Sequence, residues 1–236
     1  GYEAVENVDD VHILYYGTTE HSIQGMGVYV NAQGERFVNE GLGSSLVNQE
    51  VMQQYMARAY LILDEGVRDI IRQTPFCNAA VVGGDRIDHM IEKGITVVQA
   101  DSLEELGAKI VAETADGVSF NANNMVATVN AYNEAAAAGT ADKLDVPHLG
   151  VVPATPLVTP PFYAIPVVGG IMATFGGLKI NTEAQVIGTD DRPIAGLFAV
   201  PGCAGGIMNG DYWCVMSGYS VIGRIAGAQA AATKGE

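Results

Sequence analysis

The fold of this chain is decided by residues 176–206, GGLKINTEAQVIGTDDRPIAGLFAVPGCAGG. Short apolar runs alternate there with glycines and with a polar turn at residues 188–191. This spacing is typical of short antiparallel strands joined by tight turns. We therefore expect a β-meander over this stretch, with the apolar run at residues 196–200 as a buried last strand.

A helix with one face of small residues is expected after the meander. The C-terminal segment carries these small residues at helical spacing: Gly218, Gly223, Ala226, Gly227 and Ala230. A meander plus one helix is too small to bury a core of its own. We expect it to pack on the first part of the chain, on a partner, or on chain that is missing from this sequence.

The residues before the meander predict a mixture of strands and helices. A hairpin signal surrounds Gln33 and Gly34, and a capping box opens a helix at Ser102. We expect helices at 45–60, 86–93, 102–113 and 123–138, and strands at 60–63 and 95–98. Five prolines follow between residues 153 and 166 and indicate a connector. The expected class is α+β, with domains at residues 1–173 and 174–236.

Composition and charge exclude several classes of protein. The 236 residues carry 12 Lys+Arg against 27 Asp+Glu, a net charge of −15. Apolar residues make up 48%, too many for a disordered chain. The acidic balance argues against a nucleic-acid partner, which needs clustered Lys and Arg. No apolar run reaches the length of about 20 residues that spans a membrane, and the sequence assigns no compartment.

The common catalytic and metal-binding motifs do not occur. The three cysteines form no C-x-x-C pair, and the four histidines show no H-E-x-x-H spacing, so no metal site is predicted. The chain also has no G-x-S-x-G elbow and no P-loop, which removes the support for a hydrolase or a kinase.

Four motifs in order nevertheless resemble one family. They are residues 27–40 (GVYVNAQGERFVNE), 125–134 (MVATVNAYNE), 160–165 (PPFYAI) and 176–206. Their order and spacing resemble the flavoproteins that include soluble fumarate reductases, succinate dehydrogenase flavoprotein subunits and 3-ketosteroid Δ1-dehydrogenases. Arg36 matches the arginine of the family's G-x-R-F motif, and we interpret it as structural.

The resemblance implies a cap domain inserted into a split FAD-binding domain. Residues 1–173 would form the cap over a small-molecule substrate, and residues 174–236 the last segment of the FAD domain. The family's G-x-G-x-x-G unit, which places the FAD pyrophosphate at a helix N-terminus, does not occur in this sequence. We expect this N-terminal FAD-binding half to precede Gly1, so that FAD belongs to the intact protein and this chain alone is inactive.

The catalytic positions depart from those of fumarate reductases. By resemblance, the proton-donating arginine falls on Ser44 and the substrate-binding histidine on Ala173. A second substrate arginine falls on Tyr212, and the cofactor-contacting glutamate on Gly202. Dicarboxylates are held by guanidinium groups through paired, charge-assisted hydrogen bonds. Fumarate is therefore not the expected substrate.

Other positions are compatible with a flavin-dependent reaction. Tyr212 resembles the tyrosine of ketosteroid dehydrogenases that polarises a substrate carbonyl, and a packing role for it is the alternative. Thr19 and Glu20 match a Thr-Glu pair used at the substrate and in proton relay, a match that chance can also produce. We therefore take Tyr212 and Glu20 as candidate catalytic residues, and Thr19, Ser44 and Ala173 as candidate substrate contacts.

The resemblance also places cofactor contacts in the C-terminal segment: Gly176, Gly202, Gly205, Gly206, Ser217 and Gly218. A helix capped at Ser217 would direct its first N–H groups at the flavin N1/C2=O edge, which gains negative charge on reduction. An ordinary N-cap is the alternative for Ser217.

The predicted function is hydride transfer between FAD and a C–C bond next to a carbonyl or similar group. The alternative is a non-catalytic binding or regulatory domain that keeps the scaffold, because the family residues at four positions are replaced.

Overall fold

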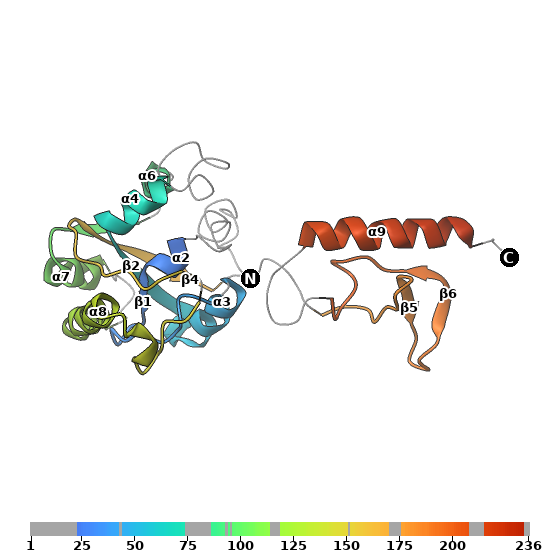
Figure 1. The fold of residues 1–236 in the computed structure, drawn as a ribbon, viewed down its shortest axis with the longest axis horizontal. Helices are drawn as coiled ribbons and strands as arrows, with labels where there is room; N and C mark the ends of the chain where they lie inside the picture. The colour runs from blue at the N-terminus through green and yellow to red at the C-terminus, as the bar shows by residue number, and fades with distance from the viewer. Residues whose placement is uncertain are drawn as a thin grey trace. The chain divides into compact units, whose positions relative to one another are not determined.

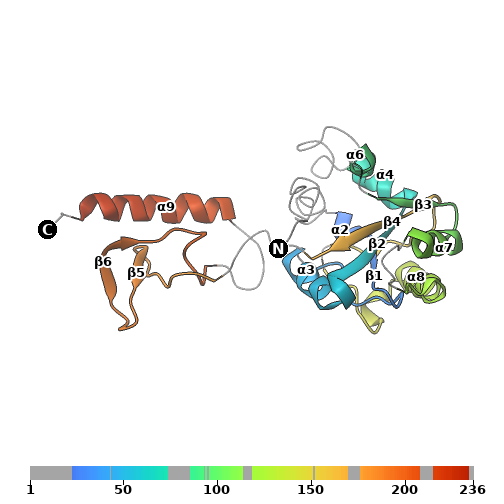
Figure 2. The same ribbon diagram turned by 180° about the vertical axis from the view of Figure 1, so that it is seen from behind.

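The computed structural model describes residues 23–42, 44–73, 86–92, 94, 96–113, 119–150, 152–169, 176–207 and 215–233. The chain forms two compact units, residues 1–170 and residues 171–236. Figure 1 and Figure 2 show them from opposite sides.

The first unit is built on a four-stranded antiparallel sheet. Its strands are β1 (Val28–Val30), β2 (Arg58–Asp64), β3 (Val98–Ala100) and β4 (Phe162–Val168), in the order β1-β2-β4-β3. Leu61 of β2 lies opposite Ile165 of β4. Leu61, Ile62 and Leu63 are consecutive and fully buried. Because successive side chains of a strand point to opposite faces, both faces of the sheet are covered at its centre.

The described helices of this unit pack around the sheet. They are α2 (Ile23–Met26), α3 (Ser44–Gln53), η2 (Tyr55–Ala57), α4 (Glu65–Gln73), α6 (Arg86–Glu92), α7 (Leu103–Glu113), α8 (Ala122–Ala137) and η3 (Ala141–Lys143). In Figure 1, α7 and α8 lie side by side, and α7 also contacts β3 and β4. The expected mixture of helix and sheet is confirmed. No described helix has the length and hydropathy needed to cross a membrane.

Several predicted elements of the first unit are confirmed, one helix is too long, and the strand expected at 95–98 lies at Val98–Ala100 instead. The capping box forms, with the Glu105 N–H donating to Ser102 Oγ at 3.1 Å, and Gly94 ends its helix with φ of +81°. The helix expected at 45–60 ends at Gln53 instead. Residues 58–60 pair with β4, because Ala59 and Tyr60 gain more by joining the buried sheet than by extending a helix.

One helix, α4, was not expected. The sequence predicted a strand at residues 60–63 and no helix directly after it. The buried side chain of Asp64 explains why α4 forms. Its Oδ1 accepts a hydrogen bond from the Val67 N–H at 2.8 Å, which caps the first turn of the helix. Its Oδ2 accepts from the amides of Val158 and Thr159, at 2.7 and 2.8 Å. Asp64 thus ties the proline-rich connector to the helix.

Replacing Asp64 with alanine is expected to destabilise the first unit by about 2 kcal/mol. The change leaves three backbone N–H groups without their carboxylate acceptor. Urea unfolding measures the loss, with Asp69→Ala as the control on the exposed side of α4. An exposed ion pair contributes little, so this control should fall within about 0.5 kcal/mol of the natural chain. Equal losses in the two variants would contradict the role assigned to Asp64.

The second unit has a hairpin, β5 (Gln185–Ile187) and β6 (Pro193–Phe198), and one helix, α9 (Val215–Ala232). In both views α9 runs along the hairpin, and it contacts β6. The buried cluster holds only Val186, Ala199 and Ala204, with Ile180 and Ile207 packed against it. The meander is present, but our prediction of a buried last strand is wrong, because β6 is exposed over most of its length. Among the described residues of this unit, the two strands and the helix leave most of β6 exposed.

Candidate functional site

Two paired segments of the second unit bring the predicted cofactor glycines together. Leu178 forms a parallel bridge with Ala204, the Leu178 N–H donates to Cys203 O at 2.8 Å, and the Gly205 N–H donates to Leu178 O at 3.0 Å. This pairing places Gly176 beside residues 202–206. A Cβ atom on Gly205 would lie 2.6 Å from the Gly177 nitrogen, so the two backbones meet only because both residues are glycine.

The other glycines leave their backbone open. Cβ atoms built on Gly176 or Gly206 would have nothing within 4 Å among the described residues. Gly202 and Gly206 adopt φ of +100° and +76°, a region that glycine occupies without strain. Exposed backbone without side chains allows a flat ligand to approach its N–H and C=O groups closely. We call residues 176–178 and 202–206 the glycine edge.

The first turn of α9 lies next to the glycine edge. A Cβ on Gly218 would lie 4.0 Å from Pro201 Cγ, and one on Gly202 would lie 3.3 Å from the Tyr219 hydroxyl. The helix begins at Val215, so Ser217 lies inside it and the predicted N-cap at that residue is wrong. Ser217 and Gly218 still lie in the first turn, where the positive end of the helix dipole favours an electron-rich ligand.

The catalytic candidates cannot be placed in the same way. Thr19, Glu20, Ala173 and Tyr212 lie outside the described residues. Ser44 is the first residue of α3, in the first unit. Of the candidates, the structure therefore brings together only those of the glycine edge and α9.

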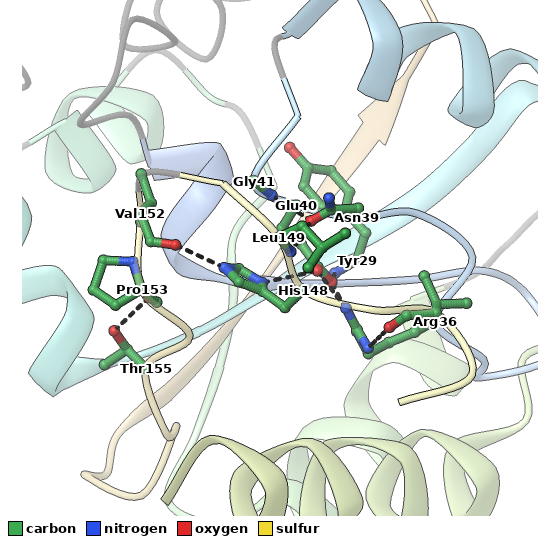
Figure 3. Close-up of polar contacts among 11 residues, drawn as sticks. Tyr29, Arg36, Asn39, Glu40, Gly41, His148, Leu149, Val152, Pro153 and Thr155 are labelled. Carbon is green, nitrogen blue, oxygen red and sulfur yellow. Dashed lines mark hydrogen bonds and ion pairs between the residues drawn. The ribbon is translucent and has the colours of Figure 1, made fainter. Parts of the chain in front are cut away.

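A buried polar cluster, which sequence reasoning missed, lies in the first unit (Figure 3). Arg36 holds the Glu40 carboxylate through two hydrogen bonds, Nε to Oε1 at 2.9 Å and Nη2 to Oε2 at 2.5 Å. The His148 ring lies between Glu40 and Val152, with Nδ1 3.3 Å from Glu40 Oε2 and Nε2 2.9 Å from Val152 O. The side chains of Arg36, Glu40 and His148 are 7%, 0% and 3% exposed.

The electrostatics of this cluster keep Glu40 ionised. Burial alone would raise the pKa of Glu40, but hydrogen bonds from His148 and Arg36 and the charge of Arg36 outweigh it, and the pKa lies below its usual value. The Tyr132 ring covers the guanidinium of Arg36 at 5.0 Å. Burial, and then the charge of Glu40, raise the pKa of Tyr132. The Tyr132 hydroxyl forms no hydrogen bond of ordinary geometry with the described residues.

The sequence held a signal for only half of this cluster. Arg36 and Glu40 stand four residues apart in the motif at 27–40, and the expected structural role of Arg36 fits its buried ion pair. His148 comes from 108 residues further along, and only the tertiary fold brings it to Glu40. Elsewhere, no group of three His, Cys, Asp or Glu side chains suited to a metal ion occurs among the described residues.

Comparisons with known proteins agree on one family. The model of a family described as an FAD binding domain matches residues 13–213. The NADH:acrylate oxidoreductase of Vibrio harveyi is 36% identical over 208 residues, which cover 86% of this chain and 18% of that protein. The NADH:fumarate oxidoreductase of Klebsiella pneumoniae is 31% identical, over 89% of this chain and 20% of that protein.

A solved structure shows the same fold. The 3-ketosteroid Δ1-dehydrogenase of Sterolibacterium denitrificans superposes with a TM-score of 0.68 at 22% identity, over 94% of this chain and 40% of that one. The chain thus spans a fifth or less of the two curated relatives named above. The FAD binding domain match assigns FAD to the intact protein as its cofactor. The chain belongs to the FAD-binding family of flavin-dependent oxidoreductases.

Proposed function

We propose that this chain is the cap domain, residues 1–173, and the C-terminal FAD-domain segment, residues 174–236, of a larger oxidoreductase. The enzyme transfers a hydride between FAD and a C–C bond next to a carbonyl or similar group. The single observation that carries the proposal is the meeting of the glycine edge with the first turn of α9. It brings an open backbone and the positive end of a helix dipole to one place.

The exposed apolar residues of the second unit support the proposal that an N-terminal FAD-binding half packs against it. Helix α9 carries one charged residue, Arg224, in 18 residues, and its Met216 is 78% exposed. Ile194 and Leu197 of β6 are also exposed. Exposed apolar side chains on both elements of so small a unit are typical of a surface that another part of a protein covers. We infer that the N-terminal FAD-binding half covers it.

The residues present fit one edge of a flavin. The positive end of α9, where Ser217 and Gly218 lie, would favour the electron-rich N1/C2=O edge, and the glycine edge would allow the ring system close approach. When bound, FAD supplies the hydride chemistry, which no side chain can provide. The protein's part is to orient the substrate, to exclude water and to stabilise charge on the substrate carbonyl.

The substrate that we propose is an enone or related compound, not fumarate. Ser44 and Tyr212 stand where fumarate reductases carry arginines, and neither forms the charge-assisted bonds that a dicarboxylate requires. The net charge of −15 does not steer anions to the chain. The Tyr212 phenol can instead donate to a ketone or enolate oxygen, and Glu20 lies in the pair that we assign to proton relay.

The test uses the intact protein, loaded with FAD and reduced under anaerobic conditions. Mixing with a panel of enones, enoates including fumarate, and quinones is followed by the return of flavin absorbance. Fast reoxidation by an enone and slow reoxidation by fumarate are the expected results. No reoxidation by any member of the panel would overturn the catalytic proposal. Tight binding of a small molecule without flavin would instead favour the non-catalytic binding domain.

A substitution on α9 tests whether an N-terminal FAD-binding half covers this helix in the intact protein. A Cβ at Gly223 meets nothing within 4 Å among the described residues. In the isolated chain, Gly223→Leu should therefore stabilise the helix by about 0.5–1 kcal/mol. In the intact protein the same side chain should collide with the covering half and lower FAD retention about tenfold, an overpacking cost of about 1.4 kcal/mol.

The two measurements are urea unfolding of the chain and the flavin-to-protein absorbance ratio after gel filtration. Thr233→Leu, just beyond the end of α9, is the matched control and should change neither. Unchanged FAD retention in the intact Gly223→Leu protein would mean that nothing covers this face.

A further inference from the structure

The buried cluster of the first unit joins two distant segments. The first holds Arg36, Asn39 and Glu40; the second holds residues 146–150 and Val152. Arg36 Nη1 donates to Val146 O at 2.7 Å, and the Leu149 N–H donates to Asn39 Oδ1 at 2.9 Å. We call these contacts, together with the His148 contacts, the clasp. It ties the residues just before α3 to those just before the proline-rich connector.

The backbones of the two segments also touch. A Cβ on Gly41 would lie 2.0 Å from Leu149 O, and one on Gly150 would lie 2.6 Å from Gly41 O. Gly150 adopts φ of +138°, which few other residues adopt. The two glycines therefore allow the backbones of the two segments to lie in contact.

Both nitrogens of the His148 ring face groups that can only accept a hydrogen bond. Nδ1 faces the Glu40 carboxylate and Nε2 faces the Val152 carbonyl. A neutral imidazole has one donor and one acceptor, whereas the imidazolium has two donors. In either neutral tautomer a ring lone pair would point at an oxygen lone pair. Only the doubly protonated ring satisfies both contacts, and it places a second cation beside Glu40.

We infer that His148 closes the clasp as an imidazolium, and that loss of one ring proton opens it and releases residues 146–152 from the Arg36–Glu40 segment. Among the described residues, the charged and titratable side chains in contact with the ring or with its ion pair are Glu40 and Arg36 from the first segment and Tyr132 from α8. Glu40 is the anion that favours the imidazolium, Arg36 opposes it by repulsion, and Tyr132 contributes its ring edge. The contacts between the two segments therefore depend on the protonation of the His148 ring.

The test is NMR of the full chain at several pH values. The ring ¹⁵N shifts of His148 distinguish the imidazolium from each neutral tautomer, and His12, His21 and His89 are references in the same spectra. Hydrogen exchange of the Leu149 amide reports whether the clasp is closed, because this N–H donates to Asn39 Oδ1. After correction for intrinsic exchange, Leu149 should exchange at least tenfold faster once the ring has lost a proton. The amides of Val158 and Thr159, bonded to Asp64, should show the intrinsic change alone.

Two variants sharpen the result. His148→Gln supplies one donor and cannot be protonated, so Leu149 should exchange rapidly at every pH. Tyr132→Phe keeps the ring and should retain the pH dependence. A neutral His148 ring with Leu149 protected throughout would overturn the inference, and so would a ring that loses its proton without any change at Leu149. Both outcomes are read from the natural chain, so they do not depend on the folding of a variant.

Discussion

Replacing Glu40 with glutamine is expected to lower the free energy of unfolding of the first unit by about 3–5 kcal/mol. The carboxylate is fully buried and accepts hydrogen bonds from Arg36, His148 and the Tyr29 N–H. Glutamine has nearly the same shape but puts an NH₂ group where an oxygen now accepts hydrogens. It also leaves the buried Arg36 charge without its anion, which costs more than the pair itself contributes.

The size of this loss should depend on pH. The pKa of Glu40 is lower in the folded chain than its ordinary value of 4.5. Its contribution is therefore complete above the pKa of the unfolded chain and is lost as the pH falls through the folded value. The natural chain and the variant should differ most near neutral pH and converge in acid.

Urea unfolding between about pH 3 and pH 7 measures this difference. Glu35→Gln is the matched control, since it makes the same change at an exposed position in the same motif, residues 27–40. It should fall within about 0.5 kcal/mol of the natural chain. If Glu40→Gln also fell within that range at neutral pH, the buried ion pair would not be a determinant of stability.

Replacing Tyr212 with phenylalanine in the intact protein is expected to slow hydride transfer to an enone by a factor of about 10²–10³. The phenol is proposed to donate a hydrogen bond to the substrate oxygen as it becomes negative. Phenylalanine keeps the ring and removes only this donor. Because the hydroxyl acts on the substrate, the FAD content of the protein should not change.

Single-turnover mixing with an enone measures the rate, and flavin absorbance measures FAD content. Tyr55→Phe is the control, because Tyr55 is 64% exposed in the first unit. It should leave both quantities unchanged. If Tyr212→Phe reacted at the natural rate, Tyr212 would be a packing residue, and if FAD content fell with the rate, its role would be structural.

Local patterns predicted most of the elements correctly. The capping box at Ser102 and the glycines at 94 and 139 mark helix ends through contacts within a few residues. Predictions failed where distant residues decide the outcome. Residues 58–60 join a strand because β4 lies beside them, and α4 starts because Asp64 caps it while holding the connector.

In the candidate site, too, some features were predicted from the sequence and others were not. Its glycines were predicted from the resemblance, and the pairing of Leu178 with Ala204 brings them together, while their contact with a cofactor remains a prediction. The helix start was misplaced by two residues, since Ser217 has the chemistry of an N-cap but α9 begins at Val215. Glu20, Thr19, Ala173 and Tyr212 remain predictions from resemblance.

The sequence by itself determined the family, the mixture of helix and sheet, and the glycines of the second unit. These follow from periodicity, from backbone freedom and from motifs in fixed order. Only the tertiary structure decided that His148 meets the Arg36–Glu40 pair and that β6 lies exposed. A buried charge must find its partners wherever the fold brings them, and 108 residues of separation leave no pattern in the sequence.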